Sequence, residues 1–372
     1  MTRKRTGEAI MKALIWDGGK WPQGITYGEF QRPKVPPGWA LVESRRTGIC
    51  GSDLHYLQGY TRHLVPDSSL PAVMGHETTG IVAEVGEGVE GLEIGDRVGL
   101  ESLHACKELG RRPCAMCQIG MYNLCHGLSI VGVPIGAMIP GGYGQYSLFH
   151  GTRVFKLPDS VSFEEAALLD TLACTVHAVN LGKPALGDVV AVVGCGIIGI
   201  DTIQCLRAAG VGSIIAVAKY DWQGEFARSY GATEVILGGE ARKPAAQVKR
   251  LTQGWGVDQV YECVGGETDA MQESLAMVRP GGRLIMEGVF SGSRPLDLLK
   301  LLLMESPILP SMCYSHHLGK REFQMALDMV ARGAAEQASM VTHRFAADDW
   351  REAFQVAIDK NKHHAVKVMF EL

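Results

Sequence analysis

The chain has 372 residues, a formal net charge of −4 and 46% apolar residues, so it can bury the cores of two ordinary domains. The slight acidity excludes the large cationic field that binding to nucleic acid or anionic lipid requires, and no apolar run approaches the roughly 20 residues of a membrane span. Ten cysteines in a chain of this length favour reduced thiols, some of them holding metal, in a cytoplasmic protein. Residues 1–10 are basic without an apolar stretch, and we expect a flexible extension there.

Residues 11–100 contain short β-rich runs set between glycine and proline, which predicts antiparallel, barrel-like structure. The runs are KALIWD, WALVESRRTG, TTGIVAEVG and GDRVGL.

From about residue 172 the pattern changes to apolar strands that alternate with helical spacing. DVVAVVG is a continuous apolar run, typical of a parallel strand buried on both faces, and IIGIDTIQCLRAAG follows with helical periodicity. Strands SIIAVA, TEVIL, VDQVYECVG and GRLIMEGV continue the alternation, which predicts a doubly wound α/β sheet. The tail predicts one amphipathic helix and a closing strand that resemble the first region. We therefore expect a first domain at 1–171, a dinucleotide-binding domain at 172–309 and a segment at 310–372 that returns to the first domain.

A glycine motif lies between the first strand and the first helix of the α/β region. Gly194, Gly196 and Gly199 form G-x-G-x-x-G, in the strand–turn–helix context that binding of a dinucleotide requires. The first glycine permits the tight turn, the second lets the backbone approach a pyrophosphate, and the third lets helix and strand pack closely. Ile197 and Ile198 open the helix, whose free N–H groups attract the anion. A glycine-rich turn without a ligand is the alternative.

The end of the next strand bears on which dinucleotide binds. NAD sites usually carry an acid there for the ribose hydroxyl, but this position holds Ala218, followed by Lys219. A missing negative charge and an adjacent cation favour the 2′-phosphate of NADP. Asp221, three residues on, leaves NAD open as the alternative.

Possible metal ligands are scattered over the chain. Cys50, His76, Glu77 and Asp170 are of the residue types that hold catalytic zinc, but no local spacing such as H-E-x-x-H joins them. Considered one at a time, each is better explained by packing or by a structural turn than by metal binding.

The motifs GICGSDLHY, VMGHETTGIVAEVG and VVGCGIIG follow one another in an order and spacing that resemble the zinc-dependent medium-chain dehydrogenase/reductase family. The resemblance runs from Met11 to Leu372 and is strongest with the sorbitol (polyol) dehydrogenase-like branch. It implies a GroES-like β-barrel catalytic domain joined to a Rossmann domain. It also implies self-association as a homodimer or homotetramer.

The resemblance implies that Cys50 and His76 bind a catalytic zinc ion, with Glu77 and Asp170 as carboxylate neighbours, one of which completes the shell. Asp170 departs from the family pattern because it is one methylene shorter than the usual glutamate and is followed by Thr171 instead of proline. Direct ligation and action through a water molecule both stay open for Asp170.

Three further residues receive catalytic roles from the resemblance. Asp53 accepts a hydrogen bond from the far nitrogen of His76 and fixes its tautomer. Ser52 contacts the oxygen of the alcohol and begins a proton relay, through the cofactor ribose, to His55 at the surface. The zinc ion acidifies the alcohol, and hydride passes to the nicotinamide.

A second cluster of cysteines has the spacing C-x7-C-x2-C-x7-C, typical of a closed structural zinc site. The first gap is longer than the two residues usual in the family, since KELGRRP replaces a dipeptide. A lobe without metal, or one closed by another residue, is the alternative. The expected ligands are Cys106, Cys114, Cys117 and Cys125, and the cysteines expected to pack in the core are Cys174, Cys195, Cys205, Cys263 and Cys313.

The expected activity is zinc-dependent hydride transfer between a secondary alcohol or polyol, which becomes a ketone, and NAD(P). A threonine or amino-alcohol dehydrogenase is the near alternative because that branch shares the ligand set. A noncatalytic nucleotide-binding protein on the same fold is the alternative from another class. It is expected to lack part of the catalytic set, all of which is present.

Overall fold

The computed structural model describes residues 9–135, 138–238 and 243–372. The chain divides into two compact units: Met1–Asp170 with Glu336–Leu372, and Thr171–Ala335. Of the extension expected at residues 1–10, residues 1–8 lie outside the described part of the chain, and strand β1 already begins at Ile10.

The boundary of the return segment differs from the one expected at residue 310. Residues 310–335 belong to the second unit, and the chain rejoins the first at Glu336. Helix α10 (Glu322–Ala331) shows why, because the buried Glu322 at its start contacts helix α4 (Leu169–Gly182). One carboxylate oxygen lies 2.7 Å from Nδ1 of His177, and the other accepts a hydrogen bond of 2.9 Å from Asn180.

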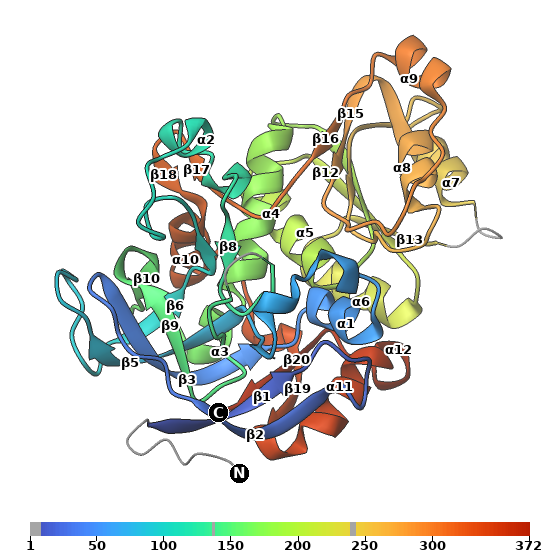
Figure 1. Cartoon of the computed structure of the whole chain (residues 1–372). Helices are drawn as coiled ribbons and strands as arrows, with labels where there is room; N and C mark the ends of the chain where they lie inside the picture. The colour runs from blue at the N-terminus through green and yellow to red at the C-terminus, as the bar shows by residue number, and fades with distance from the viewer. Residues whose placement is uncertain (1–8, 136–137, 239–242) are drawn as a thin grey trace. The chain divides into compact units, whose positions relative to one another are not determined.

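The first unit is built around a seven-stranded sheet, as the alternating runs predict. The order is β10-β6-β5-β3-β20-β19, with β9 paired to β3 (Figure 1). All of its pairs are antiparallel except β19–β20, which is parallel. Alternate residues such as Ala40, Val42 and Val82 form its core. The strands are β3 (Trp39–Gly48), β5 (Glu77–Val85), β6 (Arg97–Leu100), β9 (Tyr146–His150), β10 (Val154–Lys156), β19 (Val341–Ala346) and β20 (Lys367–Glu371).

Smaller elements complete the first unit. A three-stranded sheet has the order β2-β1-β4, and β7 pairs with β8. These strands are β1 (Ile10–Trp16), β2 (Ile25–Gln31), β4 (Ala72–Val73), β7 (Leu103–His104) and β8 (Ser129–Ile130). The helices are α1 (Gly51–Gln58), α2 (Ala115–Gln118), α3 (Phe163–Ala167), α11 (Trp350–Ile358) and α12 (Lys360–His363).

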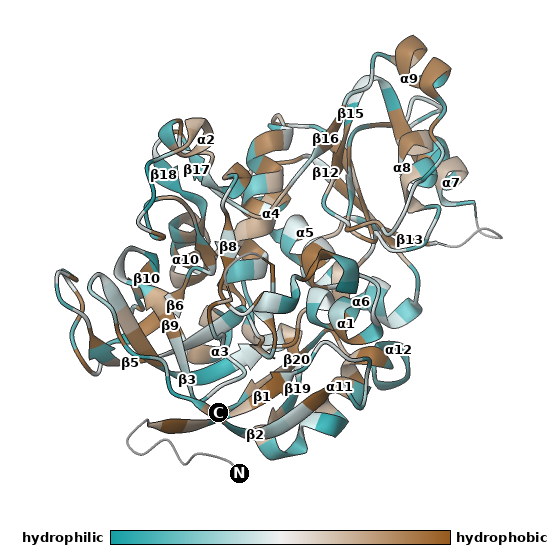
Figure 2. Ribbon diagram, viewed as in Figure 1, coloured by the Kyte–Doolittle hydropathy of each residue, from teal (hydrophilic) through white to brown (hydrophobic). Residues whose placement is uncertain are grey.

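The second unit is a six-stranded parallel sheet with the order β13-β12-β11-β14-β15-β16. The chain starts in the centre, winds outward to one edge, and then fills the other side, so the direction switches between β11 and β14. The strands are largely hydrophobic (Figure 2), and residues such as Ala191, Val260 and Leu284 are fully buried. This is the predicted doubly wound sheet. Its strands are β11 (Val189–Val193), β12 (Ser213–Ala218), β13 (Glu234–Leu237), β14 (Val257–Glu262), β15 (Val278–Met286) and β16 (Ile308–Pro310).

Helices connect these strands, and a short hairpin precedes α10. The hairpin strands are β17 (His316–His317) and β18 (Lys320–Arg321). The connecting helices are α5 (Ile197–Ala208), α6 (Asp221–Ser229), α7 (Pro244–Leu251), α8 (Ala270–Met277) and α9 (Leu298–Met304). Among the described residues, no helix has both the length and the apolar character needed to cross a bilayer.

Candidate metal and dinucleotide sites

The first unit brings three predicted metal ligands together. The ligand atoms of Cys50, His76 and Glu77 all lie within 4.8 Å of one another. Cys50 is the N-cap of α1, while His76 directly precedes β5 and Glu77 begins it. The start of α1 and the start of β5 thus lie side by side, although Cys50 comes well before His76 and Glu77 in the sequence.

The surroundings of His76 suit a cation. Burial by itself lowers the pKa of this imidazole, but the negative charges of Cys50 and Asp53 outweigh burial and raise the pKa well above its usual value. Asp170 adds to the same field. Thiolate, imidazole and carboxylate are the donors that zinc takes in catalytic sites. The residues present therefore fit a zinc ion.

Asp53 lies next to His76, but not at the hydrogen-bond distance that the family resemblance implies. Its Oδ1 is 3.8 Å from Nδ1 of His76, which is too long for a hydrogen bond. Its Oδ2 accepts hydrogen bonds from the hydroxyl of Tyr143 at 2.7 Å and from the backbone N–H of Cys50 at 3.0 Å. Burial raises the pKa of Asp53. The contact with Nδ1 leaves Nε2 of His76 as the nitrogen available to a metal.

Asp170 lies outside the group of three. Its Oδ1 accepts a hydrogen bond of 2.9 Å from the hydroxyl of Ser102, and the side chain is buried. Asp170 is close enough to raise the pKa of His76. Direct ligation of zinc by Asp170 stays a prediction.

Glu77 is held by a buried lysine that the sequence analysis missed. Nζ of Lys367, on β20, lies 2.7 and 2.6 Å from the two carboxylate oxygens of Glu77, and it also donates to the carbonyl oxygen of Ile49. The side chains of Glu77 and Lys367 are almost completely inaccessible, with exposures of 0% and 3% respectively. Gly48 pairs with Glu77 across β3 and β5, and a Cβ atom at Gly48 would collide with the Glu77 carboxylate. The lack of a side chain at Gly48 makes room for the ion pair.

The two residues assigned to a proton relay lie on α1. Ser52 and His55 are three positions apart and so share one side of the helix. The Ser52 hydroxyl oxygen is inaccessible and has no hydrogen-bond partner among the described residues. Burial and the charge of Lys360 lower the pKa of His55, which keeps its imidazole neutral near pH 7.

The four cysteines of the second cluster, whose segment 106–125 forms a lobe of the first unit, also lie close together. Cys106, Cys114, Cys117 and Cys125 place their sulfur atoms within 4.8 Å of one another. Cys106 and Cys125 are buried, with their sulfurs 3.4 Å apart. Four sulfurs at this spacing fit a tetrahedral zinc ion, and the long first gap does not prevent Cys106 from reaching the others.

The inserted residues of the lobe are tied to the barrel. Glu108, inside the insertion, accepts a hydrogen bond of 3.0 Å from the backbone of Ala105 and lies 3.0 Å from the guanidinium of Arg153. The same guanidinium pairs with Glu101 and lies over the ring of Tyr122, 4.2 Å from its centroid. Arg153 lowers the pKa of Glu108 to about 2, although burial opposes this.

The glycine motif of the second unit has the conformation that each position requires. Gly194 has a φ of +96°, and a Cβ atom there would lie 2.6 Å from the side chain of Val264. A Cβ atom on Gly199 would clash with the carbonyl oxygen of Gly194, whereas Gly196 faces open space. Gly196 is also the N-cap of α5, the helix that Ile197 and Ile198 open. The open side of this turn, at a helix N-terminus, fits a pyrophosphate.

The neighbouring strand ends without an acid. β12 finishes at the buried Ala218, and the exposed Lys219 follows, with its ammonium 5.5 Å from the centroid of the Tyr220 ring. Asp221 is the first residue of α6. The cation is therefore next to the position where NAD sites usually have an acid.

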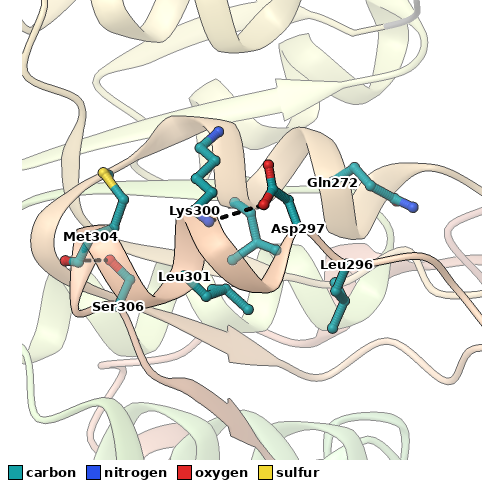
Figure 3. Close-up of a pocket in the computed structure, with 8 residues that line it drawn as sticks. Gln272, Leu296, Asp297, Lys300, Leu301, Met304 and Ser306 are labelled. Carbon is teal, nitrogen blue, oxygen red and sulfur yellow. Dashed lines mark hydrogen bonds between the residues drawn. The ribbon is translucent and has the colours of Figure 1, made fainter.

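A small pocket of about 150 Å³ lies between α8 and α9 (Figure 3). Asp297 caps α9 there by accepting a hydrogen bond of 2.9 Å from the backbone of Lys300. None of the predicted site residues lines this pocket. The pocket is therefore no part of the two metal sites or of the dinucleotide site described above.

Sequence reasoning named the candidate site residues but not the residues that contact them. Lys367, Tyr143 and Ser102 each contact a predicted residue from a distant part of the chain. One local signal exists, since Lys367 stands between valines in the apolar closing strand, where a charge needs a buried partner.

Comparison with known proteins agrees with this geometry. Residues 36–159 match the family model described as alcohol dehydrogenase GroES-like domain, and residues 198–332 match the model described as zinc-binding dehydrogenase. Sorbitol dehydrogenase of Bacillus subtilis (strain 168) is 31% identical over 340 residues, covering 91% of each chain.

Two solved structures extend the likeness. The crystal structure of 2R,3R-butanediol dehydrogenase from Bacillus subtilis has a TM-score of 0.82 at 28% identity, covering 97% of this chain and 99% of that one. A putative zinc-binding dehydrogenase from Sinorhizobium meliloti 1021, bound to NADP, has a TM-score of 0.83 at 28% identity, covering 98% and 100%.

A GroES-like unit with a thiolate–imidazole–carboxylate centre and a Rossmann-type unit with a dinucleotide motif define a zinc-binding, NAD(P)-dependent alcohol dehydrogenase. The chain belongs to the zinc-dependent medium-chain dehydrogenase/reductase family, and its relatives lie in the polyol dehydrogenase-like branch. It acts on small molecules and uses zinc and a nicotinamide cofactor.

Proposed function

We propose that the protein oxidises a secondary alcohol or polyol to a ketone, and catalyses the reverse reduction. The observation that carries the proposal is the convergence of Cys50, His76 and Glu77 at the start of α1. The same helix carries Ser52, whose buried hydroxyl has no hydrogen-bond partner among the described residues. The relatives named for sorbitol, D-arabitol phosphate and butanediol support this substrate class. The first unit carries the metal centre, and the second binds the dinucleotide.

Each site residue has a role in this proposal. Cys50 and His76 hold zinc, which as a Lewis acid lowers the pKa of a bound alcohol. Glu77 or Asp170 completes the ligand shell. Asp53, whose Oδ1 lies 3.8 Å from Nδ1 of His76, orients the imidazole through its negative charge.

Ser52 takes the proton from the substrate hydroxyl and passes it toward His55. The neutral imidazole of His55, whose pKa burial lowers, accepts the proton and releases it to solvent. Gly194, Gly196, Ile197, Ile198 and Gly199 bind the pyrophosphate through backbone N–H groups and close packing.

The proposal is tested by giving the zinc-loaded protein NADP or NAD with a panel of polyols, secondary alcohols and threonine, and following nicotinamide absorbance. Turnover of a polyol or secondary alcohol is the expected result. Turnover restricted to threonine would support the amino-alcohol alternative, which shares the ligand set. Silence across the panel, with zinc shown to be bound, would contradict the proposed substrate class and place the substrate outside the classes tested.

We propose NADP as the preferred cofactor, with NAD as the alternative. Lys219→Ala should weaken NADP binding about tenfold and NAD binding little, because a charge-assisted hydrogen bond to the 2′-phosphate contributes about 1.5–3 kcal/mol. Titration of both cofactors by nicotinamide or tryptophan fluorescence measures the effect. Lys300→Ala, which removes an exposed cation from α9, is the matched control. Equal weakening of NADP and NAD would contradict the phosphate contact.

Three further proposals complete the description. A second, structural zinc ion occupies the four-cysteine lobe. The cluster of four sulfur atoms there supports this proposal.

The chain self-associates as a homodimer or homotetramer through the second unit. The exposed leucines of the hydrophobic helix α9 support this (Figure 2): Leu298, Leu299, Leu302 and Leu303 are 66–75% exposed. The protein functions in the cytoplasm, where its thiols stay reduced.

A further inference from the structure

A glutamate that neither motif accounts for lies at the carboxyl edge of the parallel sheet. Val193, Glu262 and Met286 are aligned across β11, β14 and β15. The residues that follow them are Gly194 of the glycine motif, Cys263 and Glu287. Glu287 therefore lies on the same edge of the sheet as the dinucleotide motif, two strands away.

This edge is where the second half of the cofactor lies if the proposed function holds. In a doubly wound sheet the dinucleotide crosses the crevice at the switch point, here between β11 and β14. The glycine motif and β12 take the pyrophosphate and the adenosine half, so the nicotinamide half falls over the ends of β14 and β15. Val264 and Val289 follow these ends and are 45% and 64% exposed, which suits the face of a flat ring.

The carboxyl group of Glu287 is arranged to be protonated. Its Oε1 lies 3.0 Å from the hydroxyl of Thr202 and 3.4 Å from the thiol of Cys263. The Thr202 hydroxyl has one proton and also lies 2.8 Å from the carbonyl oxygen of Ile198. Thr202 therefore cannot donate to Ile198 and to Glu287 at the same time, and when its proton goes to Ile198 a protonated Oε1 of Glu287 can donate to the Thr202 oxygen instead.

The other oxygen of Glu287 has no such support. Oε2 is inaccessible to solvent and has no hydrogen-bond partner within the described residues. Burial raises the pKa of Glu287 to about 8, although Thr202 and Cys263 oppose this. The groups that face Glu287 are acids, thiols and one phenol: Asp201 and Cys205 from α5, and Tyr261, Glu262 and Cys263 from β14 and its end.

We propose that Glu287 makes the enzyme distinguish the oxidised from the reduced cofactor, by losing its proton when the cationic nicotinamide ring binds and keeping it when the neutral dihydronicotinamide binds. The inference rests on the proposed function. A cation next to a buried carboxyl group lowers its pKa by about 1–3 units, whereas a neutral ring does not. The proton passes to the buffer, and no covalent bond other than the O–H bond changes.

The sign of the pH dependence follows from this linkage. Between the lowered pKa of Glu287 in the complex and its higher pKa in the free enzyme, binding of the oxidised cofactor releases a proton, so the affinity rises with pH by up to about tenfold per pH unit. Above that pKa the carboxylate is already formed and the affinity no longer changes. Binding of the reduced cofactor leaves Glu287 protonated, so its affinity is independent of this group in the acidic and neutral range.

Calorimetric titration of the zinc-loaded enzyme with NADP and NADPH, at pH 7 in two buffers of different ionisation enthalpy, measures the protons released. The comparison variant is Glu287→Gln, which keeps an acceptor oxygen for Thr202 and Cys263 but cannot ionise. Glu287→Val is a second variant, and it leaves Thr202 bonded to Ile198. The difference between wild type and variant isolates Glu287 from proton release elsewhere.

With NADP the wild type should release about 0.5–1 proton more than either variant, and with NADPH the three proteins should agree. Equal proton release by the wild type and both variants with NADP, when both cofactor forms bind, would overturn this inference and leave the proposed function standing. Failure of the wild type to bind NADP, NADPH, NAD or NADH would overturn both.

Discussion

Cys50→Ala should abolish turnover and remove one equivalent of bound zinc. Cys50 supplies the thiolate of the only catalytic donor set among the described residues, and its ligand atom lies within 4.8 Å of those of His76 and Glu77. The Lewis acidity of a metal ion contributes several kcal/mol to transition-state stabilisation, so the rate should fall about a thousandfold or more. Zinc content by mass spectrometry and initial rates with an alcohol substrate check the two effects separately.

Cys205→Ala is the matched control for this variant. It also removes a buried thiol, but from α5 in the second unit, where its sulfur lies 3.4 Å from the hydroxyl of Thr175. Zinc content should be unchanged in this control. Wild-type turnover by Cys50→Ala, or loss of metal from both variants alike, would contradict the assignment of Cys50 as a catalytic ligand.

Lys367→Met should lower the free energy of unfolding of the metal-free protein, prepared with a chelator, by about 3–5 kcal/mol. The substitution leaves the carboxylate of Glu77 at 0% exposure without its cation, and an uncompensated buried charge has a cost of this size. Urea unfolding followed by circular dichroism measures the change. The double variant Glu77→Gln/Lys367→Met should recover most of the loss, since it removes both charges.

Lys156→Met provides the comparison for an exposed ion pair. Lys156 on β10 lies 2.9 Å from Asp96, but its side chain is 50% exposed, so its loss should cost no more than about 1 kcal/mol. If Lys367→Met and Lys156→Met lowered the free energy of unfolding equally, the buried ion pair would contribute no more to stability than an exposed one, which would contradict this prediction.

The fold was predictable because its signals are local. An apolar run such as Val189–Val193, followed by a glycine turn and a helical pattern, is readable within a window of about twenty residues. The domain boundary that the sequence predicts at residue 310 differs from the observed one because the contacts that set it are long-range. Glu322 joins α4 through His177 and Asn180, and no sequence period records contacts across more than 140 residues.

The candidate site was predictable only through resemblance. Cys50 and His76 have no common spacing, and each alone is compatible with simple packing. The distance of 3.8 Å between Asp53 and His76 and the bond of Tyr143 to Asp53 depend on how strands align, which spacing does not specify. Glu287 shows the same limit, since a glutamate that follows an apolar strand is visible in the sequence but its partners are not.

The pairing of Glu77 with Lys367 also dictates an order of events during synthesis. The two residues are separated by 290 positions, and the entire second unit, Thr171–Ala335, is translated between them. While the ribosome is still making that unit, Glu77 has no cation to accompany it into the interior, and β20 does not yet exist to complete the barrel sheet. The contiguous second unit can fold as soon as it emerges, whereas the first closes only through a long-range contact. Although most of the metal-binding unit precedes the second unit in sequence, its sheet needs a strand that is translated only after the whole second unit.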